Sequence, residues 1–186
     1  GVIDVDSAAT TVSALRAERD RRQTALANLR KSKAQEKSDW DKKDAKQKSK
    51  AAKQAHAKKM ADFDSKHRDL VQGMNAKDTP DQLKTVSYAS LVKGARIGGV
   101  QLKRLQHAKA DIEHKASVIA SDRTRMERDA AIYARPSSTP KQRADAKADY
   151  ETVKKDRIAT ITHLVMALER AKGVAKKLSD MAPWSD

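Results

Sequence analysis

The first part of the chain contains neither glycine nor proline from residue 2 to residue 72. These two residues are the strongest helix breakers, because glycine loses the most backbone entropy on folding and proline lacks an amide donor. A single helix over the whole run would be ~105 Å long at 1.5 Å per residue. A compact globule of this chain length is far narrower. The run therefore predicts long helices and excludes a small globular domain at this end of the chain.

Composition also favours helices over strands. Only six of the 186 residues are aromatic, glycine is scarce, and 35% of the residues carry a charge. This composition is typical of long helices and coiled coils, whereas strand-forming residues are too few and too scattered for a sheet. Cysteine is absent, which excludes disulfides, thiolate nucleophiles and cysteine metal sites.

Two short segments, residues 73–80 and 135–140, interrupt the helical pattern and contain glycine or proline. In each, a threonine precedes a proline, so we expect Asp78 or Thr79, and then Thr139, to cap a helix. The predicted helices cover about 8–74, 80–134 and 140–181. The glycines within residues 94–99 predict a bend, a new start near Val100 or a close helix crossing in the second helix.

Heptad patterns run along the second and third predicted helices. The second has Leu105, Ile112, Ile119, Met126 and Tyr133. The third has Ile161, Leu164, Leu168, Ala171, Ala175 and Leu178. Because only about five residues connect the two helices, we expect an antiparallel hairpin in which Ile119 lies near Arg157.

The first predicted helix has an apolar patch near each end. We expect this helix to fold back on the second about residues 75–80. The early patch, which includes Leu15 and Leu26, would then contact Met126, and the late patch, which includes Phe63 and Leu70, would contact Leu83 and Leu91. The expected fold class is all-α: one elongated domain over residues 1–186, built as an antiparallel coiled coil or three-helix bundle of long helices.

Residues 31–59 between the two patches are strongly basic. They contain eleven lysines and four acidic residues, within a chain whose formal net charge is +15. Such a composition is typical of disorder as well as of a solvated helix. Good helix formers and the apolar patches on both sides favour a helix.

A basic surface of one sign attracts polyanions, since lysine and arginine neutralise phosphates and release counterions. Lysine predominates over arginine here and Trp40 is the one aromatic residue in the stretch, which favours backbone contact over base reading. The bland alternative is a solubilising surface. The expected polyanion-binding residues are Lys42, Lys43, Lys46, Lys48, Lys50, Lys53, Lys58 and Lys59.

Catalysis and metal binding find little support in the sequence. His107, Asp111 and His114 share one helical face, a spacing that can hold zinc, but no further strong ligand lies nearby and the face is expected to be solvated. No nucleophile motif, glycine-rich cofactor loop or carboxylate pair in an apolar setting occurs. We expect no catalytic residue, no cofactor and no metal.

Two functions fit this pattern. The leading hypothesis is a non-catalytic structural or assembly protein that contacts nucleic-acid backbone, without sequence preference, inside a larger particle such as a virion or ribonucleoprotein. The alternative is a helical docking rod that binds an acidic protein receptor or a secretion or membrane-associated partner. No apolar run approaches the ~20 residues of a membrane span, so a soluble protein is expected and its location is otherwise unknown.

Overall fold

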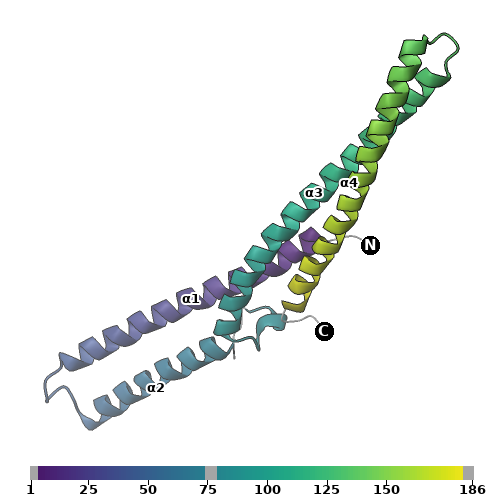
Figure 1. Cartoon of the computed structure of the whole chain (residues 1–186). Helices are drawn as coiled ribbons and strands as arrows, with labels where there is room; N and C mark the ends of the chain where they lie inside the picture. The colour runs from purple at the N-terminus through teal and green to yellow at the C-terminus, as the bar shows by residue number, and fades with distance from the viewer. Residues whose placement is uncertain (1–3, 74–78, 182–186) are drawn as a thin grey trace. The chain divides into compact units, whose positions relative to one another are not determined.

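The computed structural model describes residues 4–73 and 79–181. Within them the chain forms the helices α1 (Val5–Asp41), α2 (Lys50–Gln72), α3 (Tyr88–Ala134) and α4 (Pro140–Met181), with a 3₁₀ turn, η1 (Asp81–Leu83), before α3 (Figure 1). No strand occurs in these two ranges. The all-α prediction is therefore confirmed.

The helices form two compact units. Of the described residues, the N-terminal unit comprises 6–73, 79–100 and 178–181, and the hairpin unit comprises 101–177 with 4–5. Helices α3 and α4 contribute residues to both units. That residues 1–186 make one elongated domain stays a prediction.

The predicted helix over residues 8–74 is two helices. Helix α1 ends at Asp41 and α2 begins at Lys50, and the chain doubles back between them. The two helices run side by side, and Lys33 Nζ of α1 lies 2.6 Å from Asp64 Oδ1 of α2. The prediction of one continuous helix was wrong because a helix this polar can satisfy part of its charge by pairing with the segment that follows it.

The apolar cluster of the N-terminal unit reflects this doubling back. Leu15 of α1 packs with Leu83, Leu91 and Ala95, and Val86 packs against the cluster. We expected Leu83 and Leu91 to receive the late apolar patch. With the first segment split into α1 and α2, it is the early patch, through Leu15, that reaches them.

Helix α3 begins at Tyr88, later than the predicted residue 80, because Ser87 caps it by accepting from Ser90 N at 3.1 Å. The helix then continues without a break through residues 94–99. A Cβ atom added at Gly98 would lie 3.1 Å from Val12 Cγ2 of α1. Of the expected alternatives, the glycines thus serve a close helix crossing within the N-terminal unit.

In the hairpin unit, α3 and α4 run antiparallel as predicted (Figure 1). Arg157 Nε of α4 donates to the Ile119 carbonyl of α3 at 3.4 Å, which confirms the predicted register. Helix α4 starts at Pro140 after a reciprocal cap: Gln142 N donates to Thr139 Oγ1 at 3.1 Å, and Thr139 N donates to Gln142 Oε1 at 2.8 Å.

The buried face of α4 is narrower than the predicted heptad line. Its buried apolar residues are Ala146, Val153, Ala167, Ala171 and Leu178. Ile161 is 36% exposed and Tyr133 of α3 is 51% exposed, so both predicted seam residues lie outside this buried set. Small residues on the inner face let the helices approach closely, which leaves the larger residues on the flanks. No helix within the described ranges is long and apolar enough to span a membrane.

Candidate polyanion-binding site

The connection between α1 and α2 is a structured turn built by two caps. Asp44 N donates to Gln47 Oε1 at 3.0 Å, and Gln47 N donates to Asp44 Oδ1 at 3.0 Å. Ser49 then caps α2, with its Oγ accepting from Ala52 N at 3.1 Å. Side chains that compete for backbone amides in this way can reverse a chain without glycine or proline.

This turn gathers most of the predicted polyanion-binding lysines. We call the following six residues the basic tip: Lys42, Lys43, Lys46, Lys48, Lys50 and Lys53. Five of them are exposed, and Lys48 is half-buried. They were expected along about three turns of one helix, but the structure places them on the turn and on the first turn of α2.

Lys58 and Lys59 lie further along α2, away from the turn. Both are exposed, and Lys59 Nζ lies 3.7 Å from Glu36 Oε2 of α1. Lys59 is therefore partly neutralised by its own chain. The structure separates these two lysines from the basic tip.

An aromatic pair underlies the tip. Trp40 at the end of α1 stacks on His56 of α2, with ring centroids 4.4 Å apart and an interplanar angle of 5°. The ammonium groups of Lys43 and Lys48 lie 5.5 and 5.4 Å from the Trp40 centroid. The indole therefore interacts with a ring and with two cations of its own chain.

His56 also links the stack to an ion pair. Its Nδ1 donates to Glu36 Oε1 at 3.1 Å. This hydrogen bond, together with the charge of Lys59, holds the pKa of Glu36 below its ordinary value. Glu36 is thus ionised at neutral pH and faces α2, while the tip beyond it holds six lysines against Asp41 and Asp44.

A groove of about 540 Å³ lies between α1 and α2. Its charged lining consists of Lys31, Lys59 and Lys66 with Glu36, Asp39 and Asp62. Three cations face three anions, so this groove has no net preference for a polyanion. The excess positive charge is at the turn.

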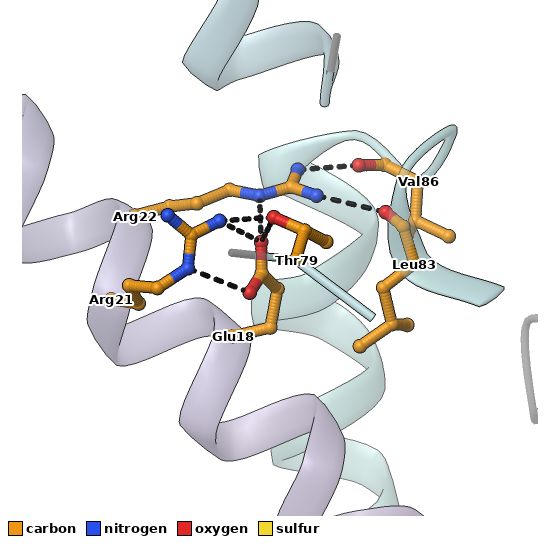
Figure 2. A network of polar contacts seen from close by, with 6 residues as sticks. All are labelled: Glu18, Arg21, Arg22, Thr79, Leu83 and Val86. Atoms are coloured by element: carbon orange, nitrogen blue, oxygen red, sulfur yellow. Dashed lines mark hydrogen bonds and ion pairs between the residues drawn. The ribbon is translucent and has the colours of Figure 1, made fainter. Parts of the chain in front are cut away.

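A second polar cluster ties α1 to the segment before α3 (Figure 2). Arg22 is fully buried, and its guanidinium donates to Glu18 Oε1 at 2.7 Å, to the Leu83 carbonyl at 2.9 Å and to the Val86 carbonyl. Thr79 donates to the same carboxylate at 2.7 Å. Arg22 thereby gives the Val86 carbonyl a donor and gives the Leu83 carbonyl a second one, beside Val86 N at 3.1 Å.

Glu18 is 3% exposed, yet it stays ionised. Burial raises the pKa of its carboxyl group, but hydrogen bonds from Arg21, Thr79 and Arg22 outweigh burial and hold the pKa below its ordinary value. Every charge in the cluster is partnered within the fold. We interpret it as a clamp for the N-terminal unit.

Carboxylates also meet in the hairpin unit near the α3–α4 turn. Asp129 is 5% exposed and its Oδ2 accepts no hydrogen bond, while Asp149 accepts from Arg125 Nε at 2.8 Å. Proximity to Asp149, together with burial, raises the pKa of Asp129, and Arg125 lowers the pKa of Asp149. When Asp129 is protonated it can donate to Asp149, which accounts for both directions.

The three residues whose spacing can hold zinc, His107, Asp111 and His114, lie on α3. His107 and His114 are exposed, and Asp111 accepts from Lys115 Nζ at 2.5 Å. Among residues 4–73 and 79–181, no group of three or more histidine, cysteine or acidic side chains is placed to hold a metal.

Some of these features have sequence signals that the helical interpretation passed over. Asp44 and Gln47 have capping-box spacing, and Ser49 precedes an alanine-rich start, which together mark a helix end. Glu18 and Arg22 have i,i+4 spacing, but nothing in the sequence distinguishes a buried pair from a solvated one.

Comparison of the chain with protein-family models, with curated proteins and with solved structures gave no match.

Proposed function

We propose that this chain is a non-catalytic structural or assembly protein whose basic tip contacts the backbone of a nucleic acid or another polyanion. The larger particle could be a virion or a ribonucleoprotein, since both bring a polyanion to a structural protein. The observation that carries the proposal is that the tip lysines lack carboxylate partners. Across the described part of the chain, none of the six has a carboxylate within ion-pair distance.

Unpaired like charges on one turn repel each other, so the tip is less stable than a mixed-charge turn would be. Two lysines elsewhere on α1 and α2 do have carboxylate partners: Lys33 with Asp64 at 2.6 Å and Lys59 with Glu36 at 3.7 Å. A solubilising surface has no need of such crowding, whereas phosphates relieve it and release counterions. The uneven distribution favours a ligand over bulk solubility.

We expect the tip to contact the nucleic-acid backbone and not the bases, because the indole ring of Trp40 already has partners within the chain. One partner ring stacks on the indole at 4.4 Å and two ammonium groups lie near it. A base would have to displace these contacts before it could stack. The tip therefore offers charge without a free aromatic platform, and we expect little sequence preference.

The architecture of the hairpin unit is a separate part of the proposal. We propose that α3 and α4 form an antiparallel coiled coil, supported by the antiparallel register of Arg157 with Ile119 and by seven-residue spacing of buried or half-buried positions at Leu105, Ile112, Ile119 and Met126. A long antiparallel coiled coil suits a structural protein, because it can hold binding surfaces at a fixed distance from one another.

The experiment replaces the four tip lysines that make no contact with Trp40 by glutamine, which keeps helix propensity and leaves the stack intact. The substituted residues are Lys42, Lys46, Lys50 and Lys53. A matched control replaces four exposed lysines of α3 and α4, namely Lys93, Lys103, Lys141 and Lys176. Both variants lower the net charge by the same amount.

Binding is measured to duplex and single-stranded nucleic acids of unrelated sequence across a salt series. We expect the tip variant to lose affinity about equally for all sequences, and its slope of log K against log salt to shrink by up to about 0.9 per lost duplex phosphate contact. The control should lose much less. Equal losses in the two variants would show that net charge alone is responsible, and the docking-rod alternative would then be the better proposal.

A further inference from the structure

Helix α4 carries large apolar side chains on its exposed face. Ile158, Ile161, Val165 and Met166 are 58%, 36%, 54% and 53% exposed. The first three have the spacing i, i+3, i+7, which places them on one side of the helix, with Thr162 between them and Met166 at the flank. This face lies entirely within the hairpin unit.

The same face continues into charged residues at both ends. One turn before Ile158 is Lys154, preceded by Glu151, and one turn after Val165 is Glu169, followed by Lys172. All four are exposed, and Glu169 and Lys172 approach each other at 3.6 Å along the helix. Outward from the centre of the face, one end has a positive and then a negative residue, and the other end has a negative and then a positive one.

Such reversal makes the face complementary to itself. A two-fold axis between Ile161 and Thr162 would set Ile158 opposite Val165 of a second, antiparallel copy. The same axis sets Lys154 opposite Glu169 and Glu151 opposite Lys172. Ile158 then meets Val165, Ile161 meets Thr162, and each of the four end charges meets its opposite, twice per pair of copies. A two-fold interface has this property by necessity, since the same surface serves both partners.

We propose that α4 pairs antiparallel with α4 of a second copy of this chain through the face from Glu151 to Lys172. Parallel pairing lacks this match, because it sets Lys154 against Lys154 and Glu169 against Glu169. The pairing also accounts for Ile161: its heptad position, which intramolecular packing leaves exposed, belongs to an intermolecular seam. Opposite charges beside such a seam fix the orientation and register of paired helices.

The occupant is a second copy and not a polyanion or an acidic protein, because the face is apolar at its centre and balanced in charge at its ends. The interaction is independent of the basic tip, which lies in the other unit. Dimerisation would give each assembly two tips, and linked sites bind more tightly than single ones when geometry permits.

The test uses the full chain, freed of nucleic acid by nuclease and high salt, in sedimentation equilibrium over a concentration series. The wild type should show a concentration-dependent species of twice the 20.6 kDa chain mass. Ile158→Glu should abolish it, because two buried carboxylates would then face apolar side chains. All substituted side chains are exposed, so circular dichroism should show unchanged helicity.

Charge reversal tests the register. Lys154→Glu and Glu169→Lys should each weaken self-association by about tenfold, since each variant creates two like-charge pairs per dimer. An equimolar mixture of the two variants should recover wild-type association, because every facing pair is then opposite in sign. Lys103→Glu on α3 changes the net charge by the same amount as Lys154→Glu and should have no effect.

A wild type that stays monomeric at about 1 mM, the weak end of useful affinities, would overturn the proposal. So would a mixture of Lys154→Glu and Glu169→Lys that associates no better than either alone. Self-association is measured without nucleic acid, and the tip lysines are tested by their own matched control, so failure here and failure of the proposed function are distinguishable.

Discussion

The ring of Trp40 lies against the ring of His56 with centroids 4.4 Å apart, and this contact joins the last turn of α1 to the first turns of α2. The stack lies beside the turn that connects α1 to α2, where the backbone reverses. The stack holds the indole ring in place, and the ammonium groups of Lys43 and Lys48 make cation–π contacts with that ring. An aromatic residue in a basic stretch therefore serves here as a structural support.

Replacing Trp40 by alanine tests that role. The substitution removes the stack and two cation–π contacts, so we expect faster amide hydrogen exchange over residues 41–53 and a local loss of about 1–2 kcal/mol. Exchange in the hairpin unit should not change, and Trp40→Phe should retain much of the protection. These rates are measured by mass spectrometry.

The same variant separates backbone contact from base stacking. If the tip contacts phosphates alone, Trp40→Ala should bind single-stranded nucleic acid within about threefold of the wild type. Stacking of one base contributes about 1–3 kcal/mol, which would appear as a loss of roughly fivefold or more for single strands. A loss of that size would contradict the proposed mode of contact.

Arg22 should be among the most sensitive positions of the N-terminal unit. Arg22→Ala removes the side-chain donor to the Leu83 and Val86 carbonyls and one partner of buried Glu18, so we expect a loss of about 3–5 kcal/mol in urea unfolding. Arg30→Ala, an exposed position on the same helix, should stay within about 0.5 kcal/mol. Similar values for the two variants would show that the clamp does not stabilise this unit.

Burial, rather than heptad position, should rank the seam residues of the hairpin unit. Leu105 is fully buried, and Leu105→Ala should cost about 2–5 kcal/mol through lost contacts and a cavity. Ile161→Ala, at a position 36% exposed, should cost less than about 1 kcal/mol in dilute protein, below any self-association. Thermal unfolding at low concentration compares the two. Equal losses of stability in the two variants would show that Ile161 belongs to the intramolecular seam.

The sequence predicted the hairpin unit well because its boundaries have unambiguous chemistry. Pro140 cannot continue a preceding helix, Thr139 caps the next one, and five connecting residues leave only an antiparallel arrangement. The register of Ile119 with Arg157 follows from that geometry. These signals are local and do not depend on the rest of the chain.

The N-terminal unit was harder to predict, and the reasons are physical. No glycine or proline marks the turn before α2, and the Asp44–Gln47 cap competes with a helix of similar stability. Which of the two forms depends on the pairing of α1 with α2, and that is a tertiary effect. Arg22 presented the same difficulty, because an arginine in a polar helix is normally solvated. The basic tip could be predicted in composition but not in shape.

The carboxyl group of Asp129 gives a pH-dependent prediction with a definite sign. Its pKa in the folded protein is raised because Asp149 lies close and because it is buried, while Arg125 and Arg128 oppose the shift. A carboxyl group whose folded pKa is raised stabilises the fold when protonated, below about pH 4, and this contribution is lost as pH rises through the folded pKa. Ionised Asp129 therefore destabilises the hairpin unit at neutral pH.

Asp129→Asn keeps the shape of the protonated group and carries no charge, so it should raise the thermal midpoint at pH 7. The gain should shrink as pH falls and vanish below about pH 4, where wild-type Asp129 is itself protonated. Midpoints measured by circular dichroism from pH 3 to 8 would contradict the assignment if Asp129→Asn were destabilising at pH 7 or if its effect did not change with pH.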